Sequence, residues 1–301
     1  MHGVCSLAPR TPDVLTGDIS VVCCERDISR CVLPGSRHRD RRPIIAVTDN
    51  CLPSRTALVT GAASGIGAGV TRHLASLGHP LALLDVDGNG VQQLAKELCD
   101  FGAQAIGVRA DVGDEPAVGA ALDEVRQKLG EIEILVNNAG FQRDNDLVDL
   151  ATDDWDAVIA AHLRGTFLLT RAVLPSMQRR KFGRIVNISS ISALGHAGRA
   201  NYIAAKAGIE AFTRAVAHEV AADGVTVNAV GPGVVVTGMT ELGARRAGRS
   251  LTDHIEVLRR TVPVGRVGAP YDIARTVAFF VADDADFVTG QILYVSGGPH
   301  G

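Results

Sequence analysis

A glycine-rich stretch between an apolar run and an amphipathic pattern constrains the fold of this chain more than any other feature. Residues 60–67, T-G-A-A-S-G-I-G, follow the apolar residues 57–59 and open a helical pattern over 65–77. A strand, a glycine turn and a helix in this order form a phosphate cradle, because glycine lets the backbone approach a pyrophosphate and a helix N-terminus offers free N–H groups. The spacing is G-x3-G-x-G, not the commoner G-x-G-x-x-G. The candidate cofactor-binding residues here are Gly61, Ser64, Gly65, Ile66 and Gly67.

From residue 56 onward, short apolar segments alternate with amphipathic ones. The predicted strands are 56–60, 81–85, 104–109, 132–137, 183–189, 225–230 and 291–295. The predicted helices are 65–77, 88–100, 114–129, 152–180, 199–222 and 270–282. Such alternation indicates a mostly parallel sheet covered by helices on both faces. We therefore predict an α/β fold with one doubly wound, Rossmann-type domain and a ligand crevice at the carboxyl ends of its strands.

Two regions fall outside this alternation. Residues 1–54 hold five of the 12 prolines and a basic cluster at 37–42, without a sustained helical period. We predict a poorly ordered N-terminal extension there, with a binding arm as the alternative for the basic cluster, and one catalytic domain over 55–301. Residues 236–262 are less regular and basic, which suits either a mobile helical flap over the crevice or a solvated surface helix.

Cysteine usage and charge limit the partners that we expect. Five of the six cysteines lie before residue 52, and no metal-binding spacing accompanies them, which favours unpaired thiols in a reducing cytoplasm. The net charge of −3 gives no reason to expect nucleic acid. No apolar run reaches the length of a membrane span, and no secretory signal pattern is present. We therefore predict a cytoplasmic protein with no metal, nucleic acid or membrane partner.

The end of the second predicted strand carries a carboxylate that bears on cofactor choice. Asp85 stands 18 residues after Gly67. A carboxylate there can accept both hydroxyls of an adenosine ribose, and it repels a 2′-phosphate. The nearby positions Ser64, Val86 and Asp87 carry no positive charge. Since one like-charge pair at ~4 Å costs roughly 1–4 kcal/mol, we expect NAD rather than NADP, although Asp85 could instead cap the next turn.

Two more strand ends carry residues that suit a dinucleotide. Asp111 and Val112 follow the third predicted strand, where an aspartate can hold the adenine amino group. The fourth strand ends in Asn137-Asn138-Ala139-Gly140, in which small side chains leave room for a cofactor and an asparagine can tie neighbouring strands together. We take Asn138, Ala139 and Gly140 as further candidate cofactor-binding residues.

The strongest chemical signal is the pair Tyr202 and Lys206. Residues i and i+4 share one helix face, so the phenol and the ammonium lie one turn apart. A free phenol with a pKa of ~10 is a poor base at neutral pH, and a neighbouring cation favours its phenolate. Such a tyrosine can exchange a proton with an alcohol or carbonyl oxygen. A strand that ends in Ser189 and Ser190 precedes the pair and makes a chance surface pairing a poorer explanation.

These residues together resemble the classical form of the short-chain dehydrogenase/reductase family. The matching stretches span about residues 56–298: they are 60–67, 137–140, Ser190, Tyr202 with Lys206, 228–233 and 287–298. The run 137–144 is similar to the 3-oxoacyl-[acyl carrier protein] reductase branch. The resemblance implies that Tyr202 is the general acid/base, that Lys206 binds the nicotinamide ribose and lowers the tyrosine pKa, and that Ser190 holds the substrate oxygen.

The resemblance also implies a nicotinamide contact and an assembly. The loop that would meet the nicotinamide carboxamide contains Pro232, Gly233, Val235 and Thr237. Members of the family are mostly tetrameric, with the region 270–298 in a subunit contact. We therefore expect a homotetramer or homodimer that acts on a small alcohol or carbonyl substrate.

Two positions depart from the family pattern. In the family the catalytic serine usually stands thirteen residues before the catalytic tyrosine, whereas Ser190 stands twelve before Tyr202. Ser189 has the usual spacing and remains an alternative. We prefer Ser190, because a deletion in the following loop is easier than a shift of the strand. The family also has an asparagine in its catalytic tetrad where His162 stands, seven residues after Trp155. His162 is either a proton relay, which would titrate near pH ~6.5, or a core residue.

We predict an NAD(H)-dependent oxidoreductase that transfers hydride between the nicotinamide and a secondary alcohol or ketone, with 3-hydroxyacyl compounds as one candidate class. An NADPH-dependent 3-oxoacyl thioester reductase is the alternative enzyme, against which Asp85 argues. A non-catalytic dinucleotide-binding regulatory protein is the alternative from another class, and the Ser190, Tyr202 and Lys206 set argues against it.

Overall fold

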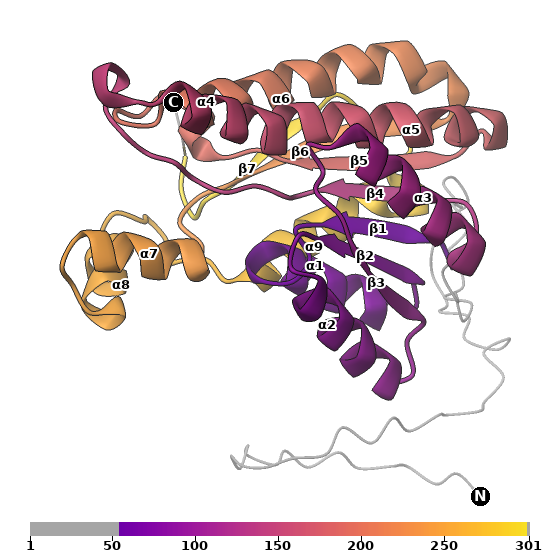
Figure 1. Ribbon diagram of the computed structural model, residues 1–301, viewed down its shortest axis with the longest axis horizontal. Helices are drawn as coiled ribbons and strands as arrows, with labels where there is room; N and C mark the ends of the chain where they lie inside the picture. Colours follow the sequence, from indigo (N-terminus) through magenta and orange to yellow (C-terminus); the bar gives the residue numbers. More distant parts are fainter. Residues whose placement is uncertain (1–53, 300–301) are drawn as a thin grey trace, which may run out of the picture. The chain divides into compact units, whose positions relative to one another are not determined.

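The computed structural model describes residues 54–299, so the extension predicted for residues 1–54 lies, except for Ser54, outside the described residues. Within 54–299, seven parallel strands form one sheet in the order β3-β2-β1-β4-β5-β6-β7 (Figure 1). Its strands are β1 (Ala57–Thr60), β2 (Leu81–Asp85), β3 (Ala105–Arg109), β4 (Ile134–Asn137), β5 (Gly183–Ile188), β6 (Val225–Pro232) and β7 (Ile292–Val295). The predicted doubly wound fold is confirmed, and the strand order reverses between β1 and β4.

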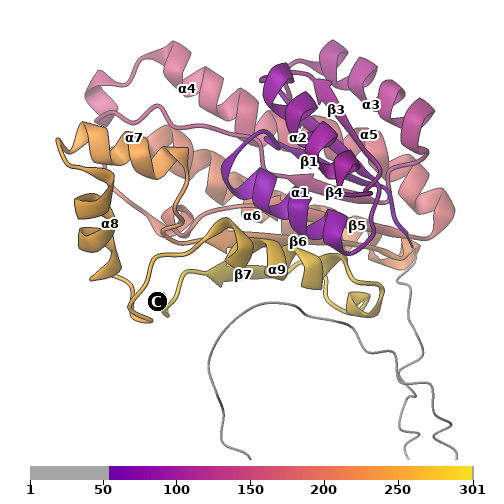
Figure 2. The same ribbon diagram turned by 90° about the horizontal axis from the view of Figure 1, so that it is seen from below.

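Helices cover both faces of this sheet (Figures 1 and 2). One face packs against α1 (Gly65–Ser76), α2 (Gly88–Asp100) and α9 (Pro270–Val281). The other packs against α3 (Glu115–Leu129), α5 (Gly165–Arg180) and α6 (Ala200–Val220). Along β1, Val59 belongs to the first core and Leu58 to the second, since successive strand residues point to opposite faces.

Two further helices stand apart from these layers. Residues 236–262, for which we predicted a flap or a surface helix, form α7 (Gly238–Arg246) and α8 (Leu251–Arg259). The two helices pack on each other and project beyond the end of the sheet in both views (Figures 1 and 2).

The helix predicted over 152–180 is interrupted. It consists of α4 (Thr152–Ile159), a π-helical turn over Ala160–Arg164, and α5. Such single-turn π-bulges are rare and often occur at functional sites, and this one carries His162. By length and composition alone, Thr152–Arg180 is the one described helix that could cross a membrane, with 44% of its most apolar window buried. Its α5 part packs against β4, β5 and α3, which is the place of a core helix.

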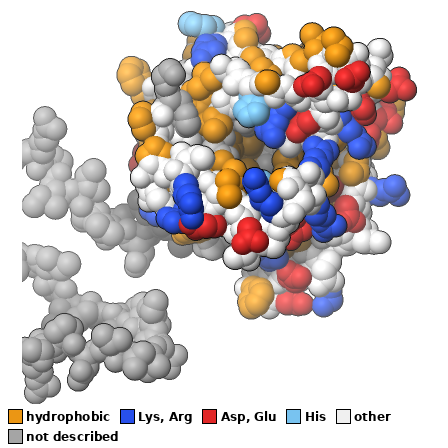
Figure 3. Space-filling model, turned by 90° about the vertical axis from the view of Figure 1, so that its left-hand side faces the viewer, with side chains coloured by type: hydrophobic (Ala, Val, Ile, Leu, Met, Phe, Trp, Pro, Cys, Tyr) orange, Lys and Arg blue, Asp and Glu red, His pale blue; other side chains and the backbone are white. Residues whose placement is uncertain are grey.

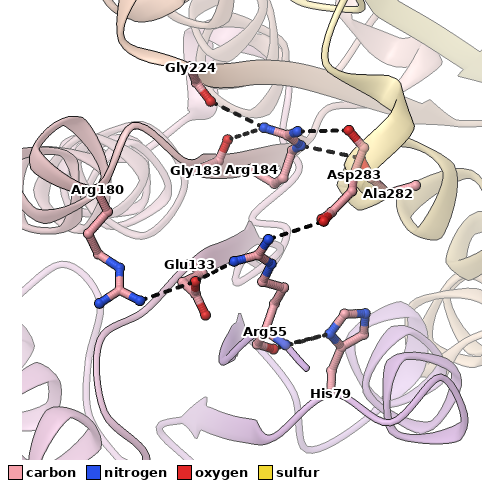
Figure 4. Close-up of polar contacts among 9 residues, drawn as sticks. All are labelled: Arg55, His79, Glu133, Arg180, Gly183, Arg184, Gly224, Ala282 and Asp283. Atoms are coloured by element: carbon pink, nitrogen blue, oxygen red, sulfur yellow. Dashed lines mark hydrogen bonds and ion pairs between the residues drawn. The ribbon is translucent and has the colours of Figure 1, made fainter. Parts of the chain in front are cut away.

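An ionic network lies at the amino end of the sheet (Figure 4). Arg55 forms ion pairs with Glu133 at 2.9 Å and with Asp283 at 3.1 Å. The guanidinium carbons of Arg55 and Arg184 lie 3.8 and 4.4 Å from the centroid of the Phe182 ring. The network therefore links the start of β1 to residues next to β4, in β5 and after α9.

Candidate active site

The carboxyl ends of β4, β5 and β6, together with α7 and α8, enclose a cavity of about 690 Å³. Many of the predicted site residues line it: Ile66, Asn138, Gly140, His162, Ser190, Tyr202, Lys206, Pro232, Gly233, Val235 and Thr237. Figure 3 looks onto the side of the molecule that carries α7 and α8, and it shows basic side chains around a hollow. The structure thus brings together residues that are up to 171 positions apart in the sequence, from Ile66 to Thr237.

The remaining predicted residues lie outside that lining, at the carboxyl ends of β1, β2, β3 and β4 or in the segments that follow them: Gly61, Ser64, Gly65, Gly67, Asp85, Asp111, Val112 and Ala139. The glycine turn among them is held from β4, because Asn138 Nδ2 donates to the carbonyls of Thr60 and Gly61 at 2.9 and 3.0 Å. A Cβ on Gly67 would lie 2.1 Å from the Gly61 carbonyl oxygen, so only glycine fits there.

The start of α1 can receive an anion. Ser64 is its N-cap, but the Ser64 side chain makes no capping hydrogen bond, and no acidic residue stands in the first turn. The first N–H groups of a helix lack intrahelical partners, and the dipole places partial positive charge there. This cradle fits the pyrophosphate of a nicotinamide dinucleotide.

The predicted ribose site contains both signs of charge. Asp85 accepts hydrogen bonds from the Ala63 N–H (Oδ2, 3.0 Å) and the Asp87 N–H (Oδ1, 3.0 Å), so it joins the end of β2 to the glycine turn. Arg109, which the sequence analysis missed, is the register partner of Asp85 across β2 and β3. Its Nε donates to the Val86 carbonyl at 3.2 Å. A positive charge therefore lies near the predicted adenosine ribose site, where the sequence analysis considered Ser64, Val86 and Asp87 and found none.

The predicted adenine site is built around a local turn. The Asp111 side chain accepts from the Gly113 N–H at 2.8 Å, and Val112 is buried in the core beside α3 and α5. Asp111 itself is exposed. The structure therefore places a solvent-accessible carboxylate at the end of β3, held by its own loop.

Tyr202, Lys206 and Ser190 meet at the cavity wall. The Lys206 ammonium lies 5.6 Å from the centroid of the Tyr202 ring and donates to the Ile188 carbonyl at 2.5 Å. Burial lowers the pKa of Lys206 to about 7. Burial also raises the pKa of Tyr202, and a hydrogen bond with the Ser190 side chain opposes this only in part. The lowered tyrosine pKa that the resemblance implied is therefore not what this structure shows, because desolvation of the phenolate outweighs its neighbours.

The two candidate serines occupy different surroundings. The Ser189 hydroxyl donates to Glu210 Oε1 at 2.7 Å and is fully buried. The Ser190 hydroxyl accepts from the Ser192 N–H at 3.1 Å and reaches the Tyr202 phenol. The geometry therefore favours Ser190 as the serine that meets a substrate oxygen.

His162 packs edge-on against the tyrosine. The ring centroids of His162 and Tyr202 lie 5.2 Å apart at 89°. His162 Nε2 contacts both the Phe141 N–H at 3.0 Å and the Phe141 carbonyl at 2.7 Å, while its buried Nδ1 has no hydrogen-bond partner among the described residues. Burial, reinforced by the positive charge of Lys206, lowers the pKa of His162 to about 3 and not the expected ~6.5. The imidazole is therefore neutral at physiological pH.

The small residue after β4 makes room for this imidazole. A Cβ added to Gly140 would lie 1.9 Å from His162 Cε1. We predicted that the missing side chain of Gly140 leaves room for a cofactor. In the structure the His162 ring fills the space next to the Gly140 Cα. Gly140 and His162 therefore form one steric unit beside Tyr202.

Sequence analysis missed several charged side chains that line the same cavity, namely Asp144, Arg199 and Arg246. Arg199 stands at the N-cap of α6, three residues before Tyr202, and that spacing was visible in the sequence. The approach of Asp144 and Arg246 was not visible, because a loop after β4 and the end of α7 are far apart in the chain.

Comparisons with known proteins identify the class of protein. A family model described as enoyl-(acyl carrier protein) reductase matches residues 61–300. The chain belongs to the short-chain dehydrogenase/reductase family, and it is an oxidoreductase that acts on CH–OH groups with a nicotinamide dinucleotide.

Among its relatives, the 3-oxoacyl-[acyl-carrier-protein] reductase of Pseudomonas aeruginosa is 41% identical over 249 residues, which cover 82% of this chain and 98% of that protein. The (2S)-[(R)-hydroxy(phenyl)methyl]succinyl-CoA dehydrogenase subunit BbsD of Thauera aromatica is 41% identical over 247 residues, covering 82% and 97%. A crystal structure of a provisionally assigned gluconate dehydrogenase from Agrobacterium tumefaciens superposes with a TM-score of 0.77 at 35% identity, covering 82% of this chain and 96% of that one.

Proposed function

We propose that this chain is an NAD(H)-dependent dehydrogenase/reductase of secondary alcohols and ketones. The observation that carries the proposal is the meeting of Ser190, Tyr202 and Lys206 on one wall of the cavity that the glycine turn adjoins. The nicotinamide, when bound, accepts or delivers the hydride. Side chains of the protein bind the substrate oxygen and transfer the proton.

The Ser190 hydroxyl holds the substrate oxygen by a hydrogen bond, and Tyr202 Oη exchanges the proton with that oxygen. Because burial raises the pKa of Tyr202, the phenol keeps its proton and is ready to act as a general acid on a carbonyl oxygen. The Lys206 ammonium, one helical turn away, offsets negative charge on the phenol when the proton leaves. The resemblance assigns Lys206 to the nicotinamide ribose as well.

The family pattern supports a homotetramer or homodimer in the cytoplasm as part of this proposal. Large apolar side chains of α9, β7 and the loop between them are exposed: Tyr271, Phe279, Phe287 and Leu293. They lie in the 270–298 region that we expect in a subunit contact.

An NADPH-dependent 3-oxoacyl thioester reductase remains the second candidate. The relative from Pseudomonas aeruginosa is named a 3-oxoacyl-[acyl-carrier-protein] reductase, and Arg109 beside Asp85 offers a cation that a 2′-phosphate could use. Cofactor choice is therefore a competition between Asp85, which repels the phosphate, and Arg109, which attracts it.

The test measures kcat/KM with NAD and NADP on a panel of secondary alcohols, ketones and 3-hydroxyacyl thioesters. We expect NAD to be preferred by at least about 10-fold, from the like-charge cost at Asp85. Asp85→Asn removes the charge and keeps an oxygen that accepts from the Ala63 N–H. It should reduce the preference for NAD over NADP by raising KM for NAD and lowering KM for NADP.

Arg109→Gln and Asp87→Asn complete the design. Asp87→Asn removes a charge two residues away and keeps the N-cap of α2, so it should shift the NAD-to-NADP ratio less than Asp85→Asn does. If the unmutated enzyme uses both cofactors equally, or prefers NADP and loses that preference in Arg109→Gln, the second candidate replaces the first.

A further inference from the structure

The cavity contains a charged cluster that the reaction described above does not use. Asp144 Oδ2 lies 3.2 Å from Arg199 Nε and 3.5 Å from Arg246 Nη1, so one carboxylate is shared by two guanidinium groups. All three residues line the same cavity as Tyr202. The cluster joins the loop after β4, the start of α6 and the end of α7.

The Arg199 guanidinium is fixed on one side and open on the other. A backbone bridge between Asn145 and Arg199 holds the two segments in register, and Asp144 engages Nε. Within residues 54–299, neither terminal nitrogen of Arg199 has a hydrogen-bond partner. Two parallel N–H groups of a guanidinium match the two oxygens of a carboxylate. Asp144 thus orients a fork that can receive a carboxylate from the cavity.

Charge in the cluster also favours an incoming anion. Two guanidinium groups face one carboxylate, which leaves one positive charge uncompensated within the cluster. The Arg199 and Asp144 side chains are only 33% and 17% exposed, so solvent screens this charge less than it would on an open surface. A bound anion would complete the balance.

The cluster lies close to the reacting oxygen. Arg199 is the N-cap of α6, three residues before Tyr202, and both residues line the same cavity. The charges of Arg199 and Asp144 both act on the pKa of the Tyr202 phenol, in opposite directions. A group held by Arg199 therefore lies in the same cavity as a carbon whose oxygen meets Tyr202 and Ser190.

We infer that the substrate is a small hydroxy acid or its oxo acid, whose free carboxylate binds the Arg199 guanidinium that Asp144 orients. This inference rests on the proposed function and adds the substrate class to it. In the reducing direction the oxo carbon gains a hydride from the reduced nicotinamide, its oxygen takes the Tyr202 proton, and the carboxylate stays unchanged. Oxidation is the reverse, with the Tyr202 phenolate taking the hydroxyl proton. A thioester at the same place has no negative charge and would leave the Arg199 guanidinium without an anionic partner from the substrate.

The test compares acids with their own methyl esters, so that only the charge differs. The probes are 2-hydroxybutyrate, 3-hydroxybutyrate, 4-hydroxypentanoate and gluconate, each beside its methyl ester, assayed with NAD and with NADP. At least one acid should exceed its ester by about 10- to 100-fold in kcat/KM, as expected for a charged hydrogen-bond pair. The acid with the largest ratio then reports the distance between the carbinol and the carboxylate.

Arg199→Gln tests the residue. It should lower kcat/KM for the preferred acid by about 10- to 100-fold more than for the ester, mainly through KM, while cofactor binding followed by fluorescence stays as in the parent. Arg245→Gln is the matched control, since Arg245 neighbours Arg246, is exposed and does not line the cavity; it should leave the ratio unchanged.

Three results would overturn the inference and leave the proposed function standing. One is an ester that is turned over as well as its acid; another is an Arg199→Gln loss that is equal for acid and ester. Turnover of ketones or thioesters together with no turnover of any acid overturns it as well. If no member of either panel is oxidised or reduced with NAD or NADP, the proposed function itself fails.

Discussion

The buried cations at the two ends of the central sheet differ in how many hydrogen bonds they form. At the amino end, each nitrogen of the buried Arg184 guanidinium donates to a backbone carbonyl; the acceptors are Gly183, Gly224, Ala282 and Asp283 (Figure 4). At the carboxyl end, the buried Lys206 ammonium has one acceptor among the described residues, the Ile188 carbonyl, and His162 leaves its Nδ1 unpaired. Arg184 thus has an acceptor for every guanidinium nitrogen, whereas Lys206 and His162 have few partners among the described residues; Arg55 Nε and Thr226 Oγ1, at the amino end, also lack one.

This difference separates a stabilising role from a functional one. A buried charge is costly unless hydrogen bonds compensate it. Burial lowers the pKa of Arg184 too, but backbone carbonyls give its guanidinium hydrogen-bond compensation at every nitrogen. Lys206 obtains little, and its pKa falls to about 7 as a result. Perturbed ionisable groups of this kind cluster at active sites. We therefore expect substitutions at the amino end to change stability alone, and substitutions at the carboxyl end to change activity and stability in opposite directions.

The largest effect on stability is expected for Arg184→Ala. The variant leaves several buried carbonyls without their donor and removes the cation over the Phe182 ring, so the free energy of unfolding should fall by about 3–5 kcal/mol. Urea unfolding measures this loss, and kcat per folded molecule should stay at the parent value. Arg179→Ala, at an exposed position of α5, is the control and should change stability by no more than about 0.5 kcal/mol. A fall in kcat for Arg184→Ala would break the separation between the two ends.

Much of this fold could be predicted from the sequence because its signals are local. Each predicted strand lies within two residues of its observed bounds, since apolar runs bounded by turn residues record burial on both faces. Ser190, Tyr202 and Lys206 were found because they lie on one strand end and one helix turn. The π-helical turn at His162 was missed, because a helical residue pattern over 152–180 does not distinguish i→i+4 from i→i+5 hydrogen bonding within one turn.

Side chains that act through neighbours from distant segments could not be predicted. Asp144, Arg199 and Arg246 meet only in the folded chain, and so do Asp85 and Arg109. The pKa directions of Tyr202 and His162 were also beyond the sequence, because they depend on desolvation, which spacing does not record. Sequence thus located the reacting groups but did not determine their charge states.

At the carboxyl end, Lys206→Met is expected to raise the free energy of unfolding, whereas Arg184→Ala lowers it. The folded pKa of Lys206 is about 7 against an ordinary value of 10.5, so the unfolded chain binds more protons between these values. The contribution of Lys206 to the free energy of unfolding is therefore present above pH 10.5 and is lost as the pH falls to 7. Removing the ammonium should raise the free energy of unfolding at pH 7 by about 1–4 kcal/mol and abolish most turnover.

The pH dependence sharpens this test. The gain from Lys206→Met should shrink as the pH rises from 7 towards 10, which denaturant unfolding at several pH values would reveal. Lys96→Met, on an exposed face of α2, should show neither the gain nor its pH dependence. A loss of stability at pH 7 would mean that the Lys206 ammonium is well compensated and that the two ends of the sheet do not differ.

The smallest effect at pH 7 is expected for His162→Asn. The imidazole is neutral there, and asparagine offers a donor and an acceptor to the same Phe141 backbone groups, so kcat should change by only a few-fold. Stability should respond in acid. Because the folded pKa is about 3 and the ordinary value is 6.5, the unfolded chain takes up a proton first, and stability is lost as the pH falls from 6.5 to 3. His162→Asn removes this loss and should move the acid unfolding midpoint to lower pH.

The pH profile of kcat decides between the two roles that we left open for His162. A titrating relay would add an ionisation between pH 5 and about 7 that His162→Asn abolishes while activity survives. The depressed pKa favours the other outcome, in which both proteins give profiles of the same shape above pH 5. His162 is then a neutral ring that packs between Gly140 and Tyr202 and holds the phenol in place. An acid-range ionisation lost in the variant would show that the imidazole is more solvated than its surroundings indicate, and would make it a fourth member of the catalytic group.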